Sequence, residues 1–265
     1  MTIRANVSRA REGVPHPDQG RAPVLTRLLL EQLDDAADGS VSIISTPDHA
    51  TTAVREATRA VEFGARANHL LPPFLFGLGR PAILAHLAAM LEAVAPIPVE
   101  IQHAPAQMGG QLTVGNLTVL AEAHPNLAAI TVESRPPGRL VSALAEQDPP
   151  LPSLVGYAGR DAIDAFERGA VGLQPGCSFP EFYVELTRRW DDCERDAAHD
   201  LRTSMLPYQS AWRLHVELIV AVEKRISAER GLFVDATVRA SCWNLDENVR
   251  ATIDAFLKEF DRWLR

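Results

Sequence analysis

From about residue 41 to residue 175, short apolar runs alternate with segments of helical periodicity, and this alternation constrains the fold most strongly. The runs are apolar enough to be buried on both faces, as parallel strands covered by helices must be. They predict strands at 41–45, 68–72, 98–102, 127–132, 153–157 and 170–175. Helices are predicted between them at 52–63, 81–94, 113–123, 137–146 and 159–168.

Strands that alternate with helices at this spacing indicate βαβ units and a parallel sheet, and therefore an α/β fold. An open doubly wound sheet and a (β/α) barrel both fit this pattern. A closed barrel of this type needs eight strands, two more than the sequence shows. No glycine-rich phosphate loop follows a strand, because GLGR at 77–80 lacks the GxGxxG spacing. A dinucleotide-binding fold therefore has little support.

The regions that flank this alternation differ from it in character. Residues 1–20 are polar and read as an arm, and residues 22–39 have helical periodicity. After Phe182 strand signals are almost absent, and helices are predicted at 181–204, 210–229 and 245–263. The predicted domains are an N-terminal arm (1–20), a barrel (21–190) and a C-terminal helical extension (191–265).

Charge and cysteine content exclude several classes of protein. The net charge is −8, with no basic run to neutralise phosphates, which argues against a nucleic-acid binder. No segment has the length and apolar content of a signal peptide or a membrane span. Three widely spaced cysteines suit a reducing compartment, so a cytoplasmic protein is expected. The histidines lack HxH or HExxH spacing, and we expect neither a metal nor another cofactor.

Five segments in order along the chain resemble the dihydrodipicolinate synthase / N-acetylneuraminate lyase family. They are LLPPFLFG (70–77), IPVEIQHAP (97–105), HPNLAAITVES (124–134), FERGAVGLQPGCSFPEFYVEL (166–186) and DDCERDAAHDL (191–201). The resemblance implies a TIM-type (β/α) barrel with a C-terminal helical extension. The family's first strand, first helix and second strand have no match, so the barrel is expected to be incomplete, with about six recognisable strands.

The family's chemistry, as the resemblance implies it, uses a lysine that forms an imine with a 2-oxo acid such as pyruvate. A tyrosine relays protons, and a Gly-Thr-Thr-Gly-Glu turn binds the substrate carboxylate. In this chain the lysine position falls on Thr131, or on Val132 if the alignment slips by one. The tyrosine position falls on Gln102, His103 replaces the usual asparagine, and the turn is missing.

Only two of the 26 basic residues are lysines, and both lie in predicted C-terminal helices. Lys224 points away from the apolar face of its helix, and Lys258 lies in the terminal amphipathic helix. Neither is near a strand, so the sequence predicts that imine chemistry is lost.

Four polar residues at two strand ends are candidates for a catalytic cup: Gln102, His103, Thr131 and Glu133. Active sites of barrels lie at the C-terminal ends of strands, where these residues could hydrogen-bond a small ligand or run acid–base chemistry. The alternative for Glu133 is a loop carboxylate paired with Arg135.

Three further residues at strand ends are candidates for substrate binding. His49, beside Asp48, is a potential base, although Asp48 is also a natural helix cap. Arg135 has the geometry to bind a carboxylate bidentately. Cys177 is either a thiol facing the barrel mouth or a packed small residue.

Two functional hypotheses follow, and whether the chain is an enzyme is left open between them. The first is a family member without imine-forming chemistry, a non-catalytic or partner subunit that binds a small oxo or hydroxy acid. The second is a diverged lyase acting on a small 2-oxo acid without a Schiff base; a decayed or truncated gene product is a third alternative. Sheet edges left by missing strands need cover, which predicts a homo-oligomer or a heteromer with a paralogue. Residues 2–8 of the arm could supply one strand.

Overall fold

The computed structural model describes residues 42–45, 50–62, 65–72, 79–108, 111–238 and 242–264. The predicted arm over 1–20, the predicted helix over 22–39 and the candidate His49 lie outside these residues. The described part forms two compact units. The sheet unit extends to Gly156 and includes Asp164–Gln174, and the helical unit comprises Tyr157–Ile163 and the chain from Pro175 onward. The predicted domain boundary after residue 190 falls within the helical unit and stays a prediction.

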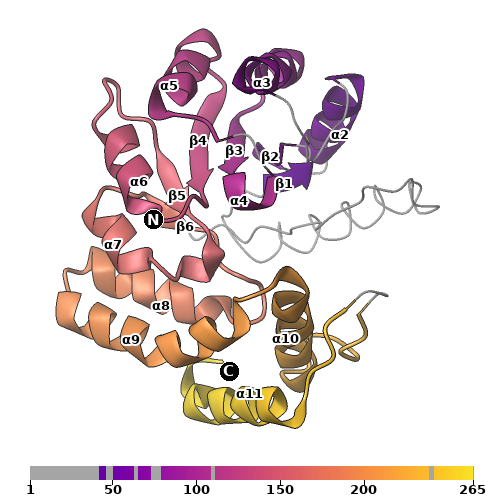
Figure 1. Ribbon diagram of the computed structural model, residues 1–265, viewed down its shortest axis with the longest axis vertical. Helices are drawn as coiled ribbons and strands as arrows, with labels where there is room; N and C mark the ends of the chain where they lie inside the picture. Colours follow the sequence, from indigo (N-terminus) through magenta and orange to yellow (C-terminus); the bar gives the residue numbers. More distant parts are fainter. Residues whose placement is uncertain are drawn as a thin grey trace. The chain divides into compact units, whose positions relative to one another are not determined.

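The sheet unit contains a six-stranded parallel sheet whose strands follow one another in sequence order (Figure 1). The strands are β1 Ser42–Ser45, β2 Ala67–Leu70, β3 Val99–His103, β4 Leu127–Val132, β5 Ser153–Val155 and β6 Gly172–Leu173. Each overlaps a strand predicted from the sequence, so the α/β prediction is confirmed. The apolar runs located these strands because parallel strands are covered on both sides.

Helices lie between successive strands of the sheet. They are α2 Ala50–Glu62, α3 Arg80–Val94, α4 Pro105–Met108, α5 Val114–Ala123, α6 Gly138–Ala145 and α7 Ala162–Glu167. Figure 1 shows α2, α3, α5 and α6 as an arc along one side of the strands. The sequence did not predict α4, because a single helical turn is too short to show periodicity.

The two faces of the sheet differ in polarity, since neighbouring residues of a strand point to opposite sides. One face carries fully buried apolar side chains such as Ile101 and Ile130. The same face carries His103, whose ring bonds the backbone just before α5, so it is the face toward the helices. The opposite face, here called the inner face, carries Glu100 and Gln102 of β3 and Thr131 of β4.

The helical unit is built around aromatic side chains. Its elements are η1 Tyr157–Gly159, α8 Pro180–Asp191, α9 Arg195–Trp212, α10 Val216–Glu229, α11 Glu247–Glu259 and η2 Asp261–Trp263. The ring of Phe256 lies 5.0 Å from Phe179, 5.3 Å from Trp212 and 5.1 Å from Phe260, measured between centroids. Of the described helices, none combines the length and apolar content needed to cross a membrane.

The breaks between the C-terminal helices differ from the predicted ones. The sequence predicts a continuous helix over 181–204, but α8 ends at Asp191 and Cys193 has a left-handed backbone with φ 62°. A left-handed residue cannot continue a right-handed helix. In turn, α9 continues through Pro207 to Trp212, and α10 starts only after His215, whose side chain accepts a hydrogen bond from the Glu217 N–H.

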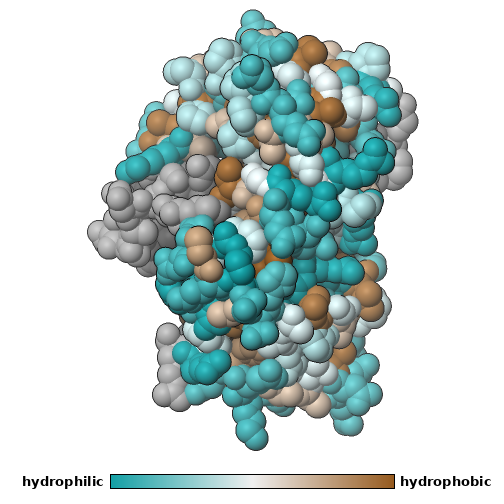
Figure 2. Space-filling model, turned by 90° about the vertical axis from the view of Figure 1, so that its left-hand side faces the viewer, coloured by the Kyte–Doolittle hydropathy of each residue, from teal (hydrophilic) through white to brown (hydrophobic). Residues whose placement is uncertain are grey.

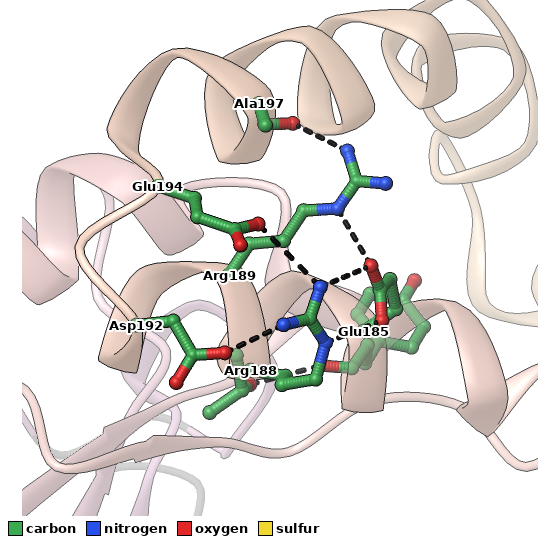
Figure 3. A network of polar contacts seen from close by, with 8 residues as sticks. Glu185, Arg188, Arg189, Asp192, Glu194 and Ala197 are labelled. Carbon is green, nitrogen blue, oxygen red and sulfur yellow. Dashed lines mark hydrogen bonds and ion pairs between the residues drawn. The ribbon is translucent and has the colours of Figure 1, made fainter.

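A polar network joins α8 to α9 across this break (Figure 3). The Arg188 guanidinium bonds Glu185 at 2.9 Å and Asp192 at 2.5 Å, and Arg189 donates to the Ala197 carbonyl at 2.9 Å. Hydrogen bonds from Arg188, followed by those from Arg189, lower the pKa of Glu185 to about 2. Glu185 therefore stays ionised near neutral pH. The network holds the turn between α8 and α9, which the sequence pattern did not predict.

Candidate functional site

Polar side chains of three neighbouring strands share the inner face of the sheet. Parallel pairing places His69 of β2 opposite Glu100 of β3, and Gln102 of β3 opposite Thr131 of β4. Because residues two apart on a strand lie on one face, Glu100 and Gln102 connect the two pairs. The result is a polar row across β2, β3 and β4, surrounded by apolar strand positions.

Direct contacts connect the deepest three members of this row. The Thr131 hydroxyl donates a hydrogen bond to Oε1 of Glu100, and Nδ1 of His69 lies 3.6 Å from Oε2 of Glu100. The exposed fractions are 0% for Thr131, 1% for Glu100 and 0% for His69. The Glu100 carboxylate is thus buried between a hydroxyl that donates to it and an imidazole ring.

Glu133 extends the polar row toward the C-terminal ends of the strands. It follows β4 directly, its backbone N–H donates to the His103 carbonyl at 2.9 Å, and its side chain is half-buried. A Cβ at Gly156, just after β5, would overlap the Glu133 carboxyl group. Glycine at this position therefore makes room for Glu133 across the end of β5. The structure brings Gln102, Thr131 and Glu133 onto one face.

His103 lies on the opposite face, so the expected cup of four side chains is reduced to three. The predicted strand ended at 102, but β3 extends to His103, and strand alternation then turns this ring away from Gln102. Its Nε2 accepts a hydrogen bond from the Leu112 N–H at 3.1 Å. Burial lowers the pKa of His103 from 6.5 to about 4, so the ring is neutral at neutral pH.

The candidate substrate-binding residues Arg135 and Cys177 lie outside the polar row. Arg135 is exposed in the loop between β4 and α6. Cys177 is exposed and belongs to the helical unit rather than to the sheet unit. Desolvation of the thiol, followed by the nearby carboxylate of Glu223, raises the pKa of Cys177. A raised pKa leaves less thiolate, which makes this cysteine a poor nucleophile.

Sequence reasoning missed two members of the row, His69 and Glu100. Each interrupts an apolar strand with an ionisable side chain, and that interruption was the available signal, because such groups are rarely buried without a partner. His69 was set aside because its spacing fits no metal motif. Among the described residues, no group of three or more histidine, cysteine or acidic side chains is arranged to hold a metal ion.

Both lysines lie on helices of the helical unit. Lys224 of α10 donates from Nζ to the Thr237 carbonyl at 2.7 Å, and Lys258 is exposed in the last turn of α11. Among the described residues, the polar row and Glu133 thus supply a hydroxyl, two carboxylates, an amide and an imidazole, but no amine.

Comparison with known proteins gives a consistent result. Residues 26–260 match the model of the dihydrodipicolinate synthetase family. An uncharacterized DapA-like lyase of Halobacterium salinarum is 27% identical over 256 residues, which cover 92% of this chain and 81% of that protein.

Solved structures agree with this chain in fold. Dihydrodipicolinate synthase of Rhodopseudomonas palustris has a TM-score of 0.80 at 21% identity, covering 89% of this chain and 80% of its own. A prophage protein of E. coli K12 from the dihydrodipicolinic acid synthase family, solved in complex with pyruvate, has a TM-score of 0.78 at 19% identity. That match covers 90% of this chain and 80% of the E. coli protein. The expected TIM-type barrel fold is thereby confirmed, with a sheet that is not closed among the described residues.

Proposed function

Because the chain belongs to the dihydrodipicolinate synthetase family, we propose that it binds a small oxo or hydroxy acid without forming an imine. In this proposal it has lost the aldolase or lyase chemistry of its relatives and acts as a non-catalytic or partner subunit. The resemblance found in the sequence is confirmed by the family match. The loss of the reaction is the part that needs testing.

One observation carries the proposal: Thr131 occupies the position that the resemblance assigns to the imine-forming lysine. Its side chain is fully buried and its hydroxyl is bonded to Glu100. A hydroxyl cannot condense with a carbonyl to give an imine, and the strand opposite offers Gln102 where the family has a tyrosine. Gln102 has no proton to relay near neutral pH.

The accessible part of the inner face can still hydrogen-bond a small acid. Gln102 is half-buried, and its amide can donate to a ligand oxygen and accept from a ligand hydroxyl. Glu133 is half-buried beside Gly156 and can accept a hydrogen bond from a hydroxyl group. Pyruvate bound to the E. coli relative supports a ligand of this size and class.

Incubation with pyruvate and borohydride is expected to leave the mass of the protein unchanged, because both lysines belong to the helical unit and neither follows a strand. Calorimetric titration with pyruvate and with lactate should nevertheless detect binding. Gln102→Leu should weaken that binding by up to about tenfold through loss of one hydrogen bond. Gln111→Leu, an exposed glutamine of the same unit, is the matched control and should leave it unchanged. A borohydride-trapped adduct would contradict the proposal.

A diverged lyase is the second candidate, and the buried contacts of Glu100 favour it. A base flanked by Thr131 and His69 is suited to proton transfer without an imine. The lyase and the non-catalytic binding protein are distinguished by whether the protein cleaves a 2-oxo acid. Release of pyruvate from an aldol-type 2-oxo acid, lost in Glu100→Gln, would support the lyase, whereas binding without release supports the non-catalytic role.

A partner role is supported by the edges of the sheet. Within the described residues, β1 pairs with β2 only and β6 pairs with β5 only. Parallel edges need cover, and we propose that a second copy or a related subunit provides it. On the face in Figure 2 hydrophobic residues form separate spots rather than one continuous apolar patch. Light scattering should give at least twice the monomer mass of 28.9 kDa. A folded monomer would contradict this.

We propose a cytoplasmic location from the state of the cysteines. The three cysteines are free and exposed, which fits a reducing compartment such as the cytoplasm.

A further inference from the structure

A buried guanidinium on α9 has an unused hydrogen-bond donor among the described residues. Arg202 is only 7% exposed, and its Nη1 has no hydrogen-bond partner in the described part of the chain. Two helical turns later, Gln209 lies on the same buried face of α9. Desolvation lowers the pKa of Arg202, because burial disfavours the charged form. A buried guanidinium is stabilised by each charge-assisted hydrogen bond that it makes.

Two further polar groups beside it have unused hydrogen-bonding capacity. Gln209 is 1% exposed and its Nε2 donates to the Tyr183 hydroxyl at 2.8 Å and to the Ala158 carbonyl at 3.0 Å. The Gln209 Oε1 has no donor within the described residues. Tyr183 is fully buried, and its hydroxyl has an acceptor in none of the described residues, so its proton is available.

Packing fixes these groups in place. The Tyr183 ring stacks on Phe179 with centroids 5.6 Å apart and meets the edge of Phe182 at 5.3 Å. Arg202 is close enough to Tyr183 for their charges to interact, as are Asp161 and Arg160, whose effects on Arg202 oppose each other. Packing therefore holds the Tyr183 ring in place near a guanidinium whose Nη1 has no hydrogen-bond partner among the described residues.

The backbone beside these groups is strained. Tyr157, Ala158 and Gly159 have consecutive left-handed conformations, with φ of 50°, 51° and 64°. For residues other than glycine, such a conformation is unfavourable and persists only where the surroundings enforce it. The hydrogen bond from Gln209 to the Ala158 carbonyl is one such constraint. Strain of this kind clusters at ligand sites.

We propose that Arg202, Tyr183 and Gln209 bind the carboxylate of a small hydroxy acid. The guanidinium and the tyrosine hydroxyl would donate to the carboxylate, and Gln209 Oε1 would accept from the ligand hydroxyl. The three groups supply two kinds of donor and one acceptor, which matches that ligand. All three belong to the helical unit, and the inference goes beyond the function proposed above.

Thermal unfolding of the full chain in sodium glycolate, at ionic strength held constant with the sodium salt of MES, tests the proposal. Glycolate should raise Tm in a saturable way, acetate should bind more weakly because it lacks the hydroxyl, and chloride should have little effect. Arg202→Gln should weaken glycolate binding at least about tenfold. Arg250→Gln, which removes the same charge from an exposed site on α11, should bind like the wild type.

Tyr183→Phe deletes a single hydroxyl, and it tests the proposed glycolate site if Arg202→Gln does not fold. It should weaken glycolate binding several-fold to about tenfold in calorimetric titration. Three results would overturn the proposal: no binding of glycolate to the wild type, unchanged affinity in the variants, or equal stabilisation by chloride.

Discussion

Replacing Glu100 with alanine is expected to lower the free energy of unfolding by about 3–5 kcal/mol. The carboxylate is 1% exposed and accepts the hydrogen bond of the Thr131 hydroxyl, while His69 lies 3.6 Å away. Alanine would leave both of these buried groups without the carboxylate, and it would also open a cavity among β2, β3 and β4.

Urea unfolding of wild-type and variant proteins measures this difference. Glu100→Gln keeps the shape and an acceptor oxygen, so it should cost at least about 1 kcal/mol less than the alanine variant. Glu122→Ala, an exposed glutamate on α5, is the matched control and should change stability by less than about 0.5 kcal/mol. Equal effects of the alanine substitutions at 100 and 122 would show that the contacts of Glu100 do not stabilise the fold.

Acidification should destabilise the chain through His103 by about 3 kcal/mol between pH 6.5 and 4. In the folded chain burial lowers the pKa of this histidine from 6.5 to about 4, and the ring is 4% exposed. The unfolded chain therefore binds a proton that the folded chain does not. The full stability is present above pH 6.5, is lost as the pH falls, and levels off below pH 4 for this group.

The contribution of His103 is isolated by comparison with His103→Gln, whose amide oxygen can still accept the hydrogen bond from the Leu112 N–H. Urea unfolding across this pH range should show a shallower loss of stability in the variant than in the wild type. His199→Gln, at an exposed position of α9, should retain the wild-type slope. Parallel curves for His103→Gln and the wild type would refute the assignment.

The sequence predicted the strands well because buried parallel strands need apolar runs, and those runs occur at all six positions. It predicted the C-terminal helices less well. The break at Cys193 depends on a left-handed residue and on the contacts of Arg188 and Arg189. Such contacts leave no periodic trace, whereas Pro207, a conspicuous helix breaker in sequence, lies inside α9.

The candidate site shows the same division. The alignment of Thr131 and Gln102 with the family's lysine and tyrosine came from the sequence, and the two residues are indeed neighbours across β3 and β4. Their roles remain predictions. The strand β3 includes His103, one residue beyond the predicted end. Because successive residues of a strand point to opposite faces, His103 lies on the face opposite to Gln102.

The sequence by itself determined the order of strands and helices and the distribution of amines, with no lysine in any strand. Those properties follow from local composition and period. Only the tertiary structure decided that Glu100 meets both Thr131 and His69, because the three residues lie on different strands and their pairing depends on the alignment of one strand against the next. It likewise decided that Arg202, Tyr183 and Gln209 share a buried environment, since no spacing along the chain requires α8 and α9 to meet there.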